Sequence, residues 1–183
     1  GGKGLRFGSQ VPKQYTVVAG RPVLEHVLTA FLKPKVFTAV VVPVPPDDRR
    51  FDELALSSDG CVYPIKGGAE RADSVQAGLD WIKAQGADAN DWVFVHDAAR
   101  PLITQHELHG LVDVIESSTC PGVVLGVPAA DTLKRADQIS PYPEHPESCI
   151  AETVDRNGLW YAMTPQVFRL GELSYALQAA KQS

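Results

Sequence analysis

Two cationic side chains flank a short glycine-rich stretch at the start of the chain. Residues 1–7 read GGKGLRF, and residues 12–15 read PKQY. Glycine lets backbone N–H groups approach a phosphate closely, and Arg6 and Lys13 add positive charge on either side. The stretch has neither the Walker A spacing nor a dinucleotide-binding fingerprint. The glycines and the two cations together predict another kind of loop that holds the phosphates of a nucleotide, with an ordinary surface turn as the alternative.

A second glycine pair leads directly into a predicted helix. Residues 67–75 read GGAERADSV, so polar residues begin the helix. The first N–H groups of a helix have no partner within it and are free to bind a ligand. Backbone groups here, together with Ser74, are predicted to contact a base edge or a ribose. The alternative is an ordinary capped helix start without a ligand.

A third group of polar residues follows an apolar run. Residues 92–95 read WVFV, and residues 96–101 read HDAARP. Asp97 would then lie at the carboxyl end of a strand, where it can bind a ribose hydroxyl, a substrate hydroxyl or a hydrated Mg²⁺. A structural ion pair with Arg100 is the alternative. His96 is interpreted as a packed or hydrogen-bonding residue, because no other His or Cys lies at zinc-ligand spacing.

These groups need a scaffold of buried strands alternating with amphipathic helices. Continuous apolar runs at 36–44, 92–95 and 122–127 predict strands buried on both faces. Apolar residues at helical spacing predict helices over 22–32, around 75–82 and around 108–115, and Thr104 with Glu107 forms a capping box before the last of these. The alternation predicts an α/β fold with a mainly parallel sheet, in which ligands bind beyond the carboxyl strand ends.

Composition narrows the class of protein further. The chain has 183 residues, enough for one domain, and its net charge of −5 argues against general nucleic-acid binding. No apolar run approaches the roughly 18 residues that cross a bilayer, so we expect no membrane association. The three cysteines are widely spaced, odd in number and interpreted as free thiols. Residues 137–148 contain three prolines and are predicted to form a linker or a projecting arm rather than a helix.

The motifs, taken in order, resemble one family over residues 1–168. They are G-x-G-x-R, P-K-Q-Y, G-G-x-E-R-x-x-S-V, V-H-D-A-A-R-P, D-T-x-K, V-D-R-x-x-L-W and T-P-Q. This series resembles the 2-C-methyl-D-erythritol 4-phosphate cytidylyltransferases of non-mevalonate isoprenoid biosynthesis. The alternatives are the related ribitol 5-phosphate cytidylyltransferases and, from another class, a catalytically inactive nucleotide-binding domain. Intact Arg6, Lys13, Asp97 and Arg156 argue against the inactive domain.

The resemblance implies a reaction and a role for each matched residue. CTP and methylerythritol phosphate would give the cytidine diphosphate alcohol and pyrophosphate, with Mg²⁺, by in-line attack on the α-phosphate. Such catalysis depends on positioning and on charge stabilisation. The family usually has Asp at the position of Ala69, so only a backbone role is carried over there. The implied catalytic residues are Arg6 and Lys13; the nucleotide-binding residues are Gly1, Gly2, Gly4, Gly68, Ala69, Ser74 and Asp97; the substrate-binding residues are Asp97, Arg100, Thr132, Arg156 and Thr164; and Asp97 is a candidate metal ligand.

The resemblance also implies a fold and an assembly. It implies a Rossmann-like sheet with helices on both faces in a single domain of residues 1–183, from which an arm of about 133–155 projects. Family members exchange this arm with a second subunit, so that Thr132 and Arg156 reach the partner's site. A homodimer is therefore expected.

The two ends of the chain depart from the family pattern. The chain begins with Gly inside the first motif, and family segments of the T-D-E-A-S and N-I-K-V-T types do not follow T-P-Q. We therefore expect both ends to be incomplete. We expect a bacterial cytoplasmic protein, although a plastid protein would carry the same motifs behind a targeting segment.

Overall fold

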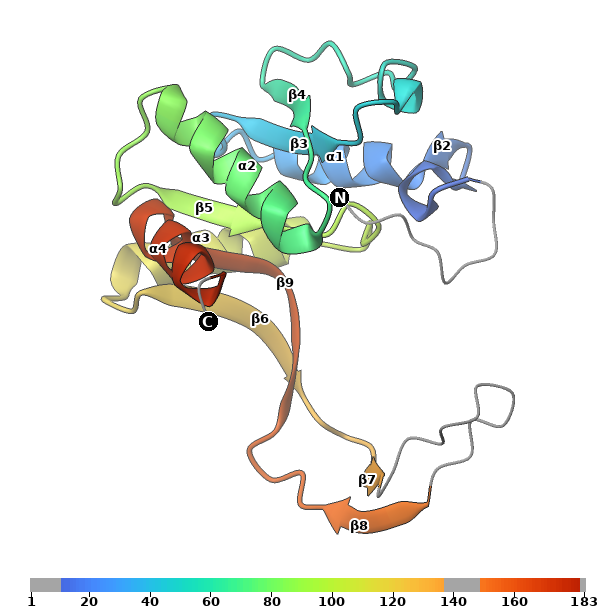
Figure 1. Cartoon of the computed structure of the whole chain (residues 1–183), viewed down its shortest axis with the longest axis vertical. Coiled ribbons are helices and arrows are strands. Elements are labelled where there is room, and N and C mark those ends of the chain that lie inside the picture. Colours follow the sequence, from blue (N-terminus) through green and yellow to red (C-terminus); the bar gives the residue numbers. More distant parts are fainter. Residues whose placement is uncertain (1–10, 137–148, 182–183) are drawn as a thin grey trace. The chain divides into compact units, whose positions relative to one another are not determined.

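The computed structural model describes residues 11–136 and 149–181 (Figure 1). Gly1, Gly2, Gly4, Arg6 and the proline-rich segment 137–148 lie outside the described residues. The helices are α1 (Val23–Leu32), α2 (Arg71–Ala84), α3 (Gln105–Ser117) and α4 (Leu170–Ala180), with 3₁₀ turns at Lys13–Tyr15 and Arg49–Phe51. The strands are β1 (Val17–Val18), β2 (Arg21–Pro22), β3 (Val40–Val44), β4 (Val62–Lys66), β5 (Trp92–Val95), β6 (Gly122–Pro128), β7 (Leu133–Ala136), β8 (Ile150–Val154) and β9 (Trp160–Arg169).

The contacts divide the chain into two compact units. The first comprises residues 1–123 and 165–183, and the second comprises residues 124–164. The first unit contains all four helices, and the second contains the antiparallel pair of β7 and β8. Each unit is described by itself below.

The strands of the first unit pair in both directions. β3 and β4 are parallel, so their carboxyl ends at Val44 and Lys66 lie at the same edge. β9 lies between β5 and β6 in a three-stranded sheet and runs antiparallel to β5. The α/β class expected from the sequence is confirmed, and the antiparallel β9 is an element that the motif spacing did not indicate.

Helices cover both faces of β5 (Figure 1). Successive side chains of a strand point to opposite faces, so neighbouring residues of β5 contact different helices. Val93 packs with Leu79 of α2 and Leu170 of α4. Its neighbour Phe94 packs against a cluster formed by Val27 and Phe31 of α1 and Leu108 of α3. A third cluster joins α1 to β3 and β4. The expected arrangement of helices on both faces is thus present around β5.

Most of the predicted elements form where the pattern indicated. The helix expected at 22–32 is α1, and the expected capping box begins α3, where the Glu107 carboxylate accepts from the Thr104 backbone N–H at 2.7 Å. The strand predicted over 36–44 is wrong for residues 36–39, since β3 begins at Val40. The ring centroid of Phe37, in that stretch, lies 5.2 Å from that of Phe31. Phe37 is therefore apolar because it packs against the core, and not because it belongs to a strand.

Candidate functional site

The glycine-rich loop between β4 and α2 is held by hydrogen bonds at both ends. The Gly67 N–H donates to the Val44 carbonyl at 2.8 Å, which extends the parallel pairing of β3 and β4 past Lys66. The Gly68 N–H donates to Ser74 Oγ at 3.1 Å, and Ser74 is only 3% exposed. The predicted residue Ser74 therefore acts on the shape of the loop, because its hydroxyl already holds the Gly68 backbone.

The same loop passes very close to the first turn of α2. A Cβ atom added to Gly68 would lie 2.2 Å from Asp73 Cβ and 2.9 Å from the Asp73 backbone carbon. Since backbone atoms cannot move aside like a flexible side chain, glycine is required here by a close approach. The loop is thus fixed in shape before any ligand binds.

Asp73 stabilises this first turn electrostatically. Its carboxylate accepts the Glu70 backbone N–H at 3.2 Å and pairs at 2.7 Å with Nζ of Lys181, the residue that follows α4. The hydrogen bond from Lys181 lowers the pKa of the Asp73 carboxyl from its usual value, and the Glu70 N–H lowers it further. The carboxylate stays ionised near neutral pH, where it complements the positive amino end of α2.

Asp97, directly after β5, lies between two arginines. Its Oδ1 accepts from Arg71 Nε at 3.1 Å, and its Oδ2 accepts from Arg100 Nε at 2.9 Å. The ion pair with Arg100, which the sequence offered as an alternative role for Asp97, is confirmed. His96 Nε2 lies 2.9 Å from the Arg100 carbonyl oxygen, and the His96 ring packs 5.1 Å from Phe31. The interpretation of His96 as a packed, hydrogen-bonding residue is also confirmed.

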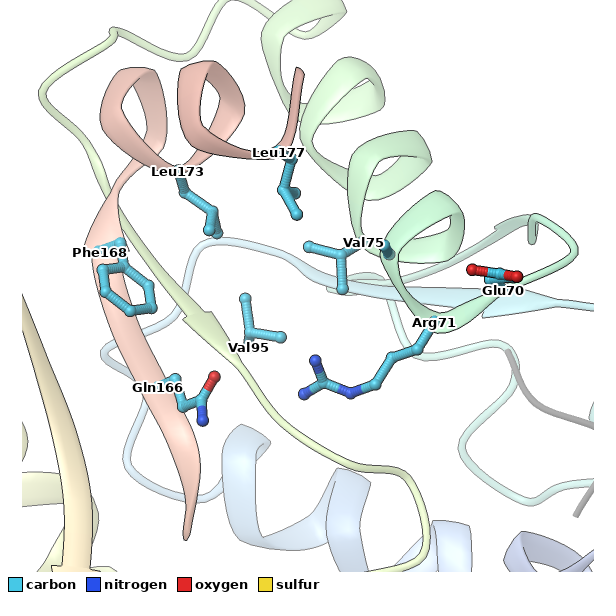
Figure 2. Close-up of a pocket in the computed structure, with 9 residues that line it drawn as sticks. Glu70, Arg71, Val75, Val95, Gln166, Phe168, Leu173 and Leu177 are labelled. Atoms are coloured by element: carbon cyan, nitrogen blue, oxygen red, sulfur yellow. The ribbon is translucent and has the colours of Figure 1, made fainter. Parts of the chain in front are cut away.

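A cavity of about 490 Å³ opens beside this group of charges (Figure 2). The Arg71 side chain extends from α2 toward Val95 and Gln166, so one end of the cavity is polar. The opposite wall is apolar and comes from α2, α4 and β9. Its lining residues are Glu70, Arg71, Ala72, Val75, Val95, Gln166, Phe168, Leu173 and Leu177.

Lys13 lies on a short turn that is anchored in the core. Tyr15, two residues later in the same turn, is 7% exposed and packs with Leu24 and Leu28 of α1. Burial raises the pKa of the Tyr15 hydroxyl above its ordinary value, and a hydrogen bond to Asp48 raises it further. Lys13 is half-buried and extends from a turn whose other end is fixed, which limits the positions its amino group can take.

The second unit brings two predicted substrate residues to one end of an antiparallel pair. Leu133 of β7 lies opposite Val154 of β8, so Thr132 and Asp155 flank the pair at the same end. Arg156 donates a hydrogen bond from Nη1 to the Ala130 carbonyl, two residues before Thr132. Both Thr132 and Arg156 are exposed to solvent. The motifs D-T-x-K and V-D-R therefore meet, although 24 positions separate the two residues in the sequence.

Thr164, within β9, has an unsatisfied hydroxyl. Its Oγ1 is buried and has no hydrogen-bond partner within residues 11–136 and 149–181. Most buried polar atoms in native proteins are paired, so an orphan hydroxyl at a predicted substrate position is consistent with a bound ligand completing it.

The described residues do not form a preassembled metal site. No group of three or more His, Cys, Asp or Glu side chains at metal-binding distances occurs among them. Asp97 already receives a guanidinium on each carboxylate oxygen, so a cation at Asp97 would compete with two arginines for this carboxylate. Mg²⁺ is commonly bound through one or two carboxylates and the phosphates of a substrate. The site as described does not by itself fit a resident metal.

Arg71 is the residue of this site to which the sequence assigned no role. It was visible in the motif G-G-x-E-R, but the motif alone did not indicate its partner. That partner is Asp97, 26 positions away on another strand end. The candidate residues Lys13, Gly68, Ala69, Ser74, Asp97 and Arg100 belong to the first unit, and Thr132, Arg156 and Thr164 belong to the second.

Comparison with known proteins places the chain next to a set of bacterial enzymes. A family model described as IspD, 2-C-methyl-D-erythritol 4-phosphate cytidylyltransferase, matches residues 1–183. A protein of that name from Ectopseudomonas mendocina is 46% identical over 179 residues, which cover 98% of this chain and 72% of the relative. The protein of the same name from Acidithiobacillus ferrooxidans is 40% identical over 185 residues, 99% of this chain and 74% of the relative.

Solved structures agree with these sequence matches. The crystal structure of a 4-diphosphocytidyl-2C-methyl-D-erythritol synthase has a TM-score of 0.79 and 38% identity, covering 92% of this chain and 76% of its own. No helix among the described residues is long and apolar enough to cross a membrane.

We predict that Gly68→Ala destabilises the protein, because the new methyl group would overlap the Asp73 backbone. Overpacking of this kind costs about 1–3 kcal/mol. The measurement is the midpoint of thermal unfolding, which should fall by several degrees. Gly60→Ala is the matched control, since a Cβ at Gly60 meets nothing within 4 Å. Equal midpoints for the two variants would contradict the close approach.

Proposed function

The chain belongs to the 2-C-methyl-D-erythritol 4-phosphate cytidylyltransferase family, and we propose that it joins CTP to 2-C-methyl-D-erythritol 4-phosphate. The products are 4-diphosphocytidyl-2-C-methyl-D-erythritol and pyrophosphate. The observation that carries this proposal is the match of the family model across residues 1–183, which includes every motif with a predicted role. A bacterial cytoplasmic location is part of this proposal, in keeping with the bacterial origin of the similar proteins.

The reaction needs no covalent enzyme intermediate. A phosphate oxygen of the alcohol phosphate attacks the α-phosphorus of CTP in line, the bond from that phosphorus to the bridging oxygen breaks, and pyrophosphate leaves with the bonding electrons. Negative charge is crowded around the α-phosphorus as both bonds are partly formed. Cations held in fixed positions stabilise that charge more than they stabilise the separate substrates.

Lys13 is proposed as one of these cations. Its turn is anchored by buried Tyr15, so little reorganisation is needed when charge develops. Arg6 is proposed as the second cation, with Gly1, Gly2 and Gly4 in the triphosphate loop; these four residues keep the roles that the resemblance implies.

The loop at Gly68 and Ala69 is proposed to bind the cytidine through backbone groups. Its shape is set by the Gly68–Ser74 hydrogen bond, which supports recognition by main-chain atoms. Such recognition tolerates Ala69 where the family usually has Asp, because any residue supplies the same N–H and C=O. Asp97 is proposed to contact the ribose.

The alcohol phosphate is proposed to bind Asp97, Arg100, Thr132, Arg156 and Thr164. Arg100 uses Nε for Asp97, which leaves its terminal amino groups for a phosphate. Mg²⁺ is proposed to enter with the triphosphate, because its preferred ligands are oxygens and the described residues offer no acidic cluster. No step of the proposed reaction depends on an ion held by protein side chains alone.

A homodimer with exchanged arms is proposed to complete the substrate site. The second unit exposes large apolar side chains, including Ile150 at 64% and Trp160 at 62% exposed. Large exposed apolar side chains are the kind that a subunit interface can bury. In the proposed dimer, Thr132 and Arg156 of one subunit reach the site that contains Lys13 of the other.

A pyrophosphate-release assay tests the reaction. With CTP and Mg²⁺, we expect release with methylerythritol phosphate and little with ribitol 5-phosphate, since the V-D-R segment matches the former family. Release with ribitol 5-phosphate alone would contradict the substrate assignment, and release with neither would favour an inactive nucleotide-binding domain.

Lys13→Ala is expected to lower kcat about 100- to 1,000-fold, as the loss of one transition-state donor typically does. The thermal midpoint should stay near that of the unaltered protein, because Tyr15 rather than Lys13 anchors the turn. Lys33→Ala at the end of α1 is the control. A loss in kcat below about tenfold, or 1.4 kcal/mol, would remove Lys13 from the transition state.

Mixed dimers test the exchange of arms. Lys13→Ala and Arg156→Ala subunits, carrying different tags, are co-expressed and assayed without separation. Each mixed dimer then has one site with both residues intact, so we expect activity to recover to about a quarter of the unaltered rate. Activity no higher than that of either variant alone would indicate that Lys13 and Arg156 act within the same subunit.

A further inference from the structure

Arg71 and Arg100 bind the same carboxylate from opposite sides. Arg71 directs both Nε and Nη2 at Oδ1 of Asp97, each at 3.1 Å, and Arg100 directs Nε at Oδ2 at 2.9 Å. The Asp97 side chain is 32% exposed, so the group lies at the surface of the first unit and within reach of a ligand.

The helix on which Arg71 lies gives no reason for an arginine there. Arg71 is the first residue of α2, where the partial positive charge of the helix end disfavours a cation by about 0.3–1 kcal/mol. Its ion pair is instead made to a residue 26 positions away, at the end of β5. The arginine therefore serves the contact with Asp97 rather than the helix.

From this geometry we infer that Arg71 is a positioning residue for the alcohol phosphate. It holds Oδ1 of Asp97, which orients the carboxylate so that Oδ2 holds Nε of Arg100. Arg100, whose side chain is 52% exposed, is thereby held in one orientation through its Nε. The inference rests on the proposed function, in which Arg100 binds the phosphate of the second substrate.

The net charge of Asp97, Arg71 and Arg100 also supports a positioning role for Arg71. The carboxylate and two guanidinium groups leave one net positive charge at the site, which favours a phosphate. Without Arg71, Asp97 would neutralise Arg100 completely, and the Arg100 side chain would have more freedom to move. Arginine is suited to this task because two of its N–H groups, Nε and Nη2, reach the same carboxylate oxygen, whereas lysine is a point charge.

Arg71 also connects the two loops that are proposed to bind the two substrates. It follows immediately after the Gly68–Glu70 loop, which is proposed to bind cytidine. Its side chain extends toward Val95 and Gln166 at the edge of the cavity (Figure 2), and its Nε donates to Asp97 in the loop after β5. A shift of either loop is therefore transmitted to the other through the Arg71–Asp97 ion pair.

The test compares Arg71→Gln and Arg71→Lys with the unaltered protein in steady-state assays. We expect Arg71→Gln to raise KM for methylerythritol phosphate about tenfold with kcat changed less than about threefold, since binding rather than chemistry is affected. Arg71→Lys keeps the charge and should recover part of this loss. Lys83→Gln is the control, because Lys83 is a cation in the last turn of the same helix, where it donates to Ser174 Oγ rather than to a residue of the site.

A double-mutant cycle shows whether Arg71 acts through Asp97. If it does, Arg71→Gln in an Asp97→Asn background should change KM no further, since the two effects are not additive. Additive effects, or a KM change under about twofold for Arg71→Gln alone, would overturn the inference. If the unaltered protein uses neither methylerythritol phosphate nor ribitol 5-phosphate, the result contradicts the proposed function rather than the role of Arg71.

In that case the unaltered protein and the variants are titrated with inorganic phosphate. Equal affinities of Arg71→Gln and the unaltered protein for phosphate would overturn the positioning role.

Discussion

The carboxylate of Asp97 joins two loops that leave different strands of the first unit. Arg71 approaches it from the first turn of α2, directly after the loop that follows β4, and Arg100 approaches it from the loop after β5. Both oxygens are engaged, so neither loop can shift without breaking a charge-assisted hydrogen bond, which is stronger than a neutral one. The relative placement of the proposed nucleotide and substrate contacts within this unit depends on that ion pair.

Three other contacts of the first unit also hold the backbone of the site in place, and their side chains are not proposed to take part in the reaction. Ser74 holds Gly68, Asp73 holds the first turn of α2, and Tyr15 anchors the turn that carries Lys13. Phosphoryl transfer of the proposed kind gains most of its rate from the placement of charges around the reacting phosphorus. The loops after β4 and β5 and the turn at Lys13 are proposed to provide that placement.

The second unit contributes differently. Thr132 and Arg156 meet because β7 and β8 pair in antiparallel register, with Leu133 opposite Val154. Their exposure, together with the exposed apolar side chains of the same unit, supports the proposed assembly of a site from two subunits.

The sequence by itself determined the fold class, α1, β5, the capping box of α3 and the positions of the chemical motifs. These depend on local periodicity and spacing, which are readable along the chain. Only the tertiary structure decided that Asp97 pairs with Arg71 as well as Arg100, that Ser74 is buried against Gly68, that β9 runs antiparallel to β5, and that residues 36–39 serve the core rather than a strand. Each of these depends on contacts between distant residues, and side-chain partners across such separations are set by packing rather than by local pattern.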